Sequence, residues 1–181
     1  MFQRFVVVAI LLLGIPAAAY AQGDRWIVVG ATYGGIVGDG TASNKFDLAP
    51  GGYFEYGVFF SSHWGATIAG TSFSPTKNHV GSHSASATFY APYYGDVRWR
   101  PRAGRPFTPF VAFGMGWQRM HFEGTQGADN QGVFSAGAGF QLRLTNKGVI
   151  LQVLARPYAI ASNDLGQSTG FDVQVGVGRS W

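Results

Sequence analysis

The stretch FDVQVGVGRSW, residues 171–181, alternates apolar residues with small or polar ones along most of its length. One parity carries Phe171, Val173, Val175, Val177 and Trp181, while Asp, Gln, Gly and Ser occupy the other. A period of two places these sets on opposite faces of a β-strand. Because the polar face lacks the Lys and Glu mixture of a water-exposed sheet, we predict that it lines a narrow interior and that the apolar face meets lipid.

Two other segments repeat this pattern with larger apolar residues. In residues 109–122, Phe113, Met115 and Trp117 alternate with Ala, Gly and Gln, and residues 133–144 alternate Phe, Ala and Leu with Ser, Gly and Gln. A soluble barrel, such as a secreted carrier of small hydrophobic molecules, would show the same alternation with its apolar face inward. The Gly-rich polar face favours the lipid-facing arrangement instead.

Eight segments of this kind can be recognised, separated by turn-forming residues. They are residues 25–35, 50–61, 64–74, 86–99, 109–122, 133–144, 149–160 and 171–181. Long connections follow the first, third, fifth and seventh segments, and shorter ones follow the others. Long outer loops and short periplasmic turns are typical of outer-membrane barrels. The predicted fold is therefore all-β: an eight-stranded antiparallel up-and-down transmembrane β-barrel.

The composition excludes several other classes. Of the 181 residues, 46% are hydrophobic and only 12% are charged, and the chain contains 27 Gly, 8 Pro and no Cys. So many Gly and Pro argue against a helical bundle, and a mean hydropathy of +0.07 is too low for a helical membrane protein. Without Cys there is no disulfide framework and no thiolate metal site. The net charge of +4 comes with no basic stripe, so nucleic-acid binding is not expected.

Residues 1–21 have the features of a secretory signal peptide. Arg4 precedes an apolar run over residues 5–15, Pro16 interrupts it, and Ala19-Tyr20-Ala21 forms a small-x-small cleavage site. The apolar run is shorter than the roughly 20 residues that a membrane-spanning helix needs. We expect the barrel domain to comprise residues 22–181.

The rare charged residues of the strands should lie inside the barrel. Period two directs Glu55, Asp96, Arg98, Arg156 and Asp172 away from lipid, and it does the same for Arg143. A charge in a narrow interior must be paired or hydrated. We predict a polar lumen network composed of Glu55, Asp96, Arg143, Arg156 and Asp172. Such a network is either a plug that stabilises the barrel or the lining of a small pore or ligand site.

The two ends of the barrel should differ in charge. The predicted outer connections hold two lysines and five carboxylates, whereas the predicted periplasmic turns hold Arg100, Arg102, Arg105 and Lys147. The basic turn WRPRAGRP, residues 99–106, could meet anionic headgroups of the inner leaflet or simply be solvated.

The chain resembles the small eight-stranded outer-membrane barrels of the OmpA/OmpX membrane-domain kind over residues 22–181. The closing strand FDVQVGVGRSW and the segment PFTPFVAFGMGW, residues 106–117, carry the resemblance. It implies location in the outer membrane of a Gram-negative (diderm) bacterium, contact with lipid and lipopolysaccharide, and delivery by periplasmic chaperones to the barrel-assembly machinery. In that family the C-terminal aromatic is part of the assembly signal. The residues at these positions are Phe171, Val173, Val175, Val177 and Trp181.

One enzymatic alternative is specific enough to name. In the outer-membrane lipid A deacylase family, the seventh strand ends in a His-x-Ser-Asn motif that supplies the catalytic His and Ser. This chain has Ile160-Ala161-Ser162-Asn163 at the matching place, so the resemblance lacks the His. A set made of Ser162, His121 and Glu123 is also conceivable.

We expect neither a catalytic role nor a metal or cofactor site. His79 and His83 are four apart, but that spacing aligns ligands only on a helix. The predicted role is structural or surface interaction by a monomer, with the outer loops contacting an extracellular ligand or host surface. A lipid A-modifying hydrolase and a narrow channel or small-hydrophobe transporter remain as alternatives.

Overall fold

The computed structural model describes residues 24–38, 44–46, 48–73, 76–80, 83–122, 128–161 and 167–181. Within these ranges the only regular elements are strands, and no helix there is long and apolar enough to cross a membrane. The predicted signal peptide lies outside the described residues.

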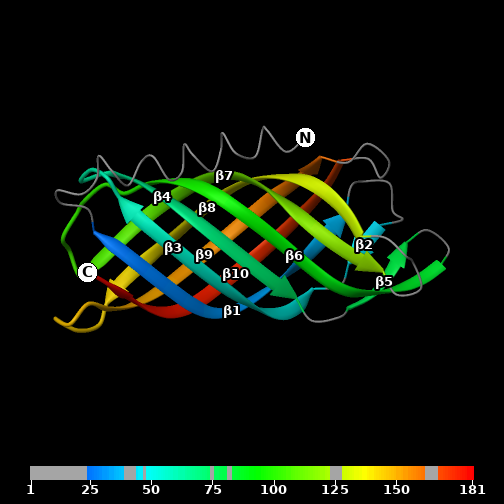
Figure 1. The fold of residues 1–181 in the computed structure, drawn as a ribbon, viewed down its shortest axis with the longest axis horizontal. Coiled ribbons are helices and arrows are strands. Elements are labelled where there is room, and N and C mark those ends of the chain that lie inside the picture. The colour runs from blue at the N-terminus through cyan, green and yellow to red at the C-terminus, as the bar shows by residue number, and fades with distance from the viewer. Residues whose placement is uncertain are drawn as a thin grey trace.

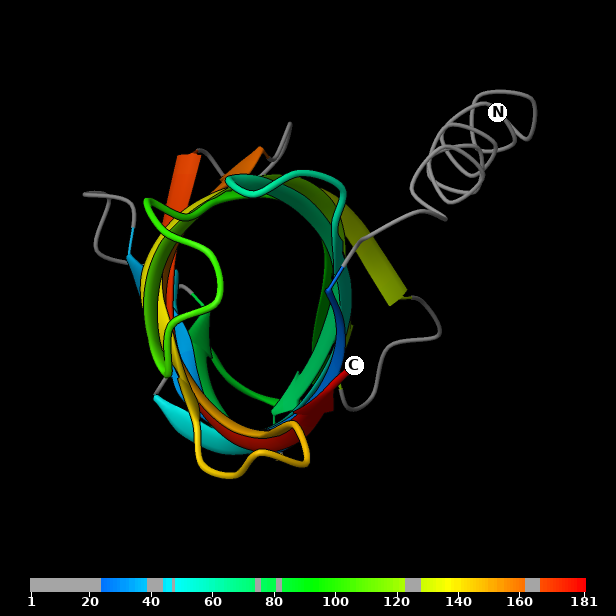
Figure 2. The ribbon, with the colours of Figure 1, turned by 90° about the vertical axis from the view of Figure 1, so that its left-hand side faces the viewer.

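Eight strands form a closed antiparallel barrel (Figures 1 and 2). They are β1 (Arg25–Gly38), β3 (Ala49–Phe59), β4 (Trp64–Phe73), β6 (His83–Trp99), β7 (Phe107–Phe122), β8 (Ala128–Arg143), β9 (Val149–Ala161) and β10 (Gln167–Ser180). Each pairs with the next, and β10 pairs with β1 to complete the ring. This confirms the predicted fold class, and all eight predicted segments correspond to barrel strands. Strand β6 continues past Pro92 as one element.

The register of the closing pair is regular over most of its length. Partners run without interruption from Trp26 opposite Ser180 to Ile36 opposite Gly170. Side chains alternate as the sequence pattern predicts: Val28 is fully buried in the interior, whereas its neighbour Val29 is 58% exposed on the outside. The outer face is consequently apolar, and the interior contains most of the polar side chains of the strands.

The two ends of the barrel are built differently. The connections 60–63, 100–106 and 144–148 lie at the same end as Arg25 and Trp181, which is the periplasmic end of an outer-membrane barrel. Figure 2 looks into this end and shows the green β6–β7 connection bending inward over the opening.

At the opposite, outer end the sheet extends beyond the ring. Two short strands, β2 (Asn44–Phe46) and β5 (Thr76–Val80), lie there (Figure 1). Strand β2 pairs with β5, and β5 pairs with the first residues of β6. The first and second outer connections, which were predicted only as loops, are thus joined by backbone hydrogen bonds.

One glycine on β3 provides a test of how tightly the interior is packed. The indole of Trp26 covers Gly57 so closely that a methyl group at this position would overlap the ring. We expect Gly57→Ala to lower the free energy of unfolding by about 1–3 kcal/mol, because the buried indole must move. Urea unfolding of the refolded barrel in detergent measures this.

Gly52→Ala is the matched control on the same strand. A methyl group there would meet its nearest atom at 3.8 Å, an ordinary contact. We expect a change of less than about 0.5 kcal/mol for this surface position. Equal effects of the two substitutions would show that the indole of Trp26 does not restrict the side chain at position 57.

Candidate functional site in the barrel lumen

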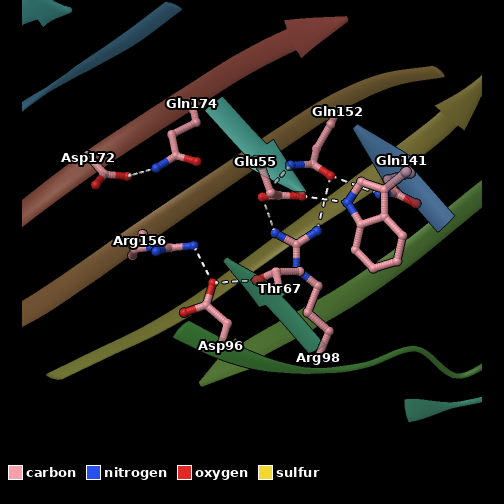
Figure 3. Close-up of polar contacts among 10 residues, drawn as sticks. Glu55, Thr67, Asp96, Arg98, Gln141, Gln152, Arg156, Asp172 and Gln174 are labelled. Carbon is pink, nitrogen blue, oxygen red and sulfur yellow. Dashed lines mark hydrogen bonds and ion pairs between the residues drawn. The ribbon is translucent and has the colours of Figure 1, made fainter. Parts of the chain in front are cut away.

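Glu55 lies at the centre of a group of hydrogen-bonded side chains in the lumen (Figure 3). Its carboxylate is fully buried and forms an ion pair with the guanidinium of Arg98, which is also fully buried. The indole Nε1 of Trp26 donates a hydrogen bond of 2.6 Å to Oε1, and Nε2 of Gln152 donates one of 3.0 Å to Oε2. Burial without partners would disfavour this charge strongly, so the three donors are what makes its position possible.

Gln152 joins Glu55 to further strands. Its Oε1 accepts a hydrogen bond of 3.1 Å from Nη1 of Arg98 and one of 2.8 Å from Nε2 of Gln141. Five strands, β1, β3, β6, β8 and β9, are thereby linked across the interior by side chains. The chemical effect of this group is to cross-link the wall of the barrel.

A second group of charges lies nearer the outer end. Nη2 of Arg156 is 2.6 Å from Oδ2 of Asp96, which also accepts a hydrogen bond of 3.2 Å from Thr67. Asp172 is the register partner of Arg156 on β10 and accepts a hydrogen bond of 3.1 Å from Gln174. The guanidinium of Arg156 lies over the ring of Tyr94 at 4.2 Å.

Apolar clusters lie on both sides of this polar middle. At the periplasmic end the cluster consists of Trp26, Val28, Tyr53, Phe59 and Ile150. Towards the outer end it consists of Ala49, Phe73, Tyr94, Val133, Tyr158 and Ile160. All of these side chains are buried. The interior is therefore filled by side chains, as is usual for a barrel of eight strands.

The structure brings four of the five predicted network residues into the lumen. Glu55, Asp96, Arg156 and Asp172 are all buried there, at most 3% exposed. The expectation for Arg143 is wrong: its side chain is exposed and lines a pocket at the periplasmic mouth, together with Arg105. Its parity is inward, but it is the last residue of β8. It therefore lies closer to the periplasmic end of the barrel than the network does.

Sequence reasoning missed several partners that complete the network. Arg98 was placed on the inward parity but left out of the network, although it forms the ion pair with Glu55. Trp26, Gln152 and Gln174 share the inward parity of their strands and are fully buried. Parity could have identified them as lumen residues, whereas their hydrogen bonds depend on how strands far apart in sequence face each other.

Three residues of the predicted assembly signal, Val175, Val177 and Trp181, face outward and are about half exposed. Their role in assembly stays a prediction.

The candidate metal-binding and catalytic residues are not brought together among the described residues. His79 and His83 lie on the two strands of the β5–β6 hairpin rather than on a helix. The described residues contain no cluster of three or more groups able to hold a metal. Ser162, Asn163 and Glu123 lie outside the described residues.

A closed eight-stranded ring with an apolar outer face and a polar, side-chain-filled interior defines the class of small outer-membrane barrels. The chain belongs to the outer membrane protein beta-barrel domain family, whose model matches residues 5–179. The protein is thus an outer-membrane protein of a Gram-negative bacterium, as predicted. No curated protein sequence matches the chain.

Several solved structures share the fold. The attachment invasion locus protein Ail of Yersinia pestis, in complex with the heparin analogue sucrose octasulfate, is 16% identical, with a TM-score of 0.60 over 88% of this chain and 99% of Ail. OprG of Pseudomonas aeruginosa is 14% identical, with a TM-score of 0.63 over 88% and 96% of the two chains. Neisserial surface protein A is 12% identical, with a TM-score of 0.65 over 88% and 100%.

The ion pair between Glu55 and Arg98 generates a prediction for stability. Arg98→Met removes the cation and leaves the buried carboxylate without it, so we expect a loss of about 3–5 kcal/mol in the free energy of unfolding. The double variant Glu55→Gln/Arg98→Met should lose less, because no buried charge is left over. Urea unfolding of the three refolded proteins measures both effects.

Arg143→Ala is the control for this experiment. Because its side chain is exposed at the mouth, we expect a change of less than about 0.5 kcal/mol. A double variant that is less stable than Arg98→Met alone would refute this account of the lumen.

Proposed function

We propose that the barrel is a non-conducting anchor that holds its outer connections at the cell surface for contact with an extracellular partner. The observation that carries the proposal is the filled lumen. Cross-linked polar side chains and two apolar clusters occupy the interior. Interaction is therefore expected at the ends of the barrel, of which the outer end faces extracellular partners. Exposed loops on a rigid scaffold are a common place for binding.

The outer sheet extension supports this role. Strands β2 and β5 tie the first two outer connections into the sheet that continues from β6. A contact surface held by backbone hydrogen bonds loses less conformational entropy on binding than free loops do. The extension therefore favours a recognition surface over loops that only cover the barrel.

The charge of the outer connections bears on the kind of partner. The Ail structure contains a heparin analogue, so a polyanion is one ligand that this fold suggests. In this chain, however, the outer connections carry five carboxylates and two lysines. Because charge complementarity governs encounter, we propose that the partner is neutral or basic rather than a polyanion.

We also propose that the protein is not a lipid A hydrolase. The deacylase resemblance would require a His at position 160, where this chain has Ile160. That side chain is 2% exposed and belongs to the outer apolar cluster of the lumen. A base at this position would point into the barrel rather than towards lipid. Mass spectrometry of lipid A from cells with and without the protein tests this, and loss of an acyl chain would overturn it.

Surface contact is tested by replacing residues 76–83 with a short Asn-Gly turn. The substitution removes β5 and leaves the ring of eight strands intact, so we expect heat-modifiable gel migration to be retained. Adhesion of a non-adherent strain expressing the protein should occur on immobilised matrix proteins, fall to background for the variant, and be absent on immobilised heparin for both. Adhesion that is unchanged by the replacement would contradict the proposal.

Conduction is tested by recording from planar bilayers. The two apolar clusters close the lumen on either side of its polar middle, so we expect no stepwise ionic current from the purified, refolded protein. The quadruple variant Trp26→Ala/Glu55→Ala/Arg98→Ala/Gln152→Ala, which removes the group of side chains around Glu55 without leaving its carboxylate unpaired, serves as a comparison. Discrete current steps from the unaltered protein would favour the channel alternative.

A further inference from the structure

Basic residues are concentrated at the periplasmic end of the barrel. Seven of the 13 Lys and Arg residues of the chain lie there. They are Arg25, Arg100, Arg102, Arg105, Arg143, Lys147 and Arg179. Among the described side chains of this end, Asp24 supplies the only carboxylate. The end therefore has a large positive charge, whereas the chain as a whole carries +4.

The one carboxylate is already occupied. Oδ2 of Asp24 is 3.0 Å from Nη2 of Arg100, whose Nε donates a hydrogen bond of 3.0 Å to the carbonyl of Ser62. The guanidinium of Arg100 also lies over the ring of Phe59 at 3.6 Å. Arg100 is consequently a buried structural group of the mouth and is not available for a ligand.

The other cations of this end are differently placed. Arg102, Arg105, Lys147 and Arg179 are exposed. None of them forms an ion pair with a carboxylate in the part of the chain that the structure describes. Exposed guanidinium groups without a protein partner are well suited to bind phosphate, because their paired N–H donors match two phosphate oxygens.

An aromatic girdle lies at the same end of the barrel as these cations. Trp64 and Trp99 are register partners at the ends of their strands and are 47% and 36% exposed. Phe107 and Trp181, at the same end, are 54% and 57% exposed. Aromatic side chains on the outer face of a membrane barrel mark the interface between hydrocarbon and headgroups. Arg179, two residues before Trp181, is on the same outward parity.

We propose that this basic rim, composed of Arg102, Arg105, Lys147 and Arg179, binds the phosphate groups of anionic phospholipids in the periplasmic leaflet. The exposed cations, which form no ion pair with a described carboxylate, and the adjacent girdle give a positive charge to the end of the barrel that borders the headgroups. Attraction between the basic rim and the anionic lipid then strengthens membrane binding beyond the apolar contact of the barrel wall. It also favours the orientation in which this end faces the periplasm.

The test measures the lipid that the refolded protein retains. The full chain is inserted into vesicles of phosphatidylcholine with a minority of phosphatidylglycerol and extracted with its surrounding lipid by an amphipathic copolymer. A basic residue at an anionic surface changes binding about fivefold, so we expect phosphatidylglycerol to be enriched at least about twofold over the bulk membrane. The enrichment should disappear at high salt, since exposed charges are screened.

Two variants distinguish rim binding from a general charge effect. Arg102→Gln/Arg105→Gln/Lys147→Gln/Arg179→Gln should abolish the enrichment, whereas Lys45→Gln/Lys77→Gln, at the outer end, should leave it unchanged. Heat-modifiable migration checks that each variant is folded. If the quadruple variant does not fold, Arg179→Gln and the salt series on the unaltered protein carry the same test. Enrichment that is equal in all proteins, absent throughout or insensitive to salt would overturn the proposal and leave the rim as solvated turns.

Discussion

The structure depends on one constraint, which is that every backbone N–H and C=O group in the hydrocarbon must have a hydrogen-bond partner within the protein. A sheet with a free edge fails this requirement, and the regular pairing of β10 with β1 removes the edge. Closure then fixes the two faces of every strand. The outside must be apolar because it meets lipid, and the small, polar and charged side chains of the strands must lie in the narrow interior. The alternation of the closing strand, the Gly-rich inner face and the buried charges all follow from this division.

Inside the ring, the difficulty is to bury three carboxylates. Glu55 is held by a guanidinium and two neutral donors, and Asp96 is held by a guanidinium and one hydroxyl. Asp172 lies opposite Arg156 in the register. Such groups contribute little to stability compared with apolar packing of the same volume, but an unpaired member would be costly. Their contacts join strands that face each other across the lumen.

The sequence was sufficient to predict most of the fold, because a period of two is a local property and the alternation of connection lengths indicates which end is which. It was also sufficient to place Glu55, Asp96, Arg156 and Asp172 in the lumen. Arg143 was misplaced because parity gives the face of a residue and not its height along the barrel axis. The partnership of Glu55 with Trp26 and Gln152 was not predictable for a related reason, since it depends on the register of strands that are not neighbours. The pairing of β2 with β5 joins two separate connections, and neither has a pattern that indicates it.

The contacts of Glu55 have a consequence for the order of assembly. Gln152 is 97 residues away in sequence and Arg98 is 43, so the carboxylate has all its partners only when β1, β3, β6 and β9 have come together. In a chain that stops before β9 the sheet stays open, and Glu55 and Arg98 remain accessible to solvent. An incomplete barrel therefore differs from a complete one in that the carboxylate of Glu55 lacks part of its set of donors and is still accessible to water.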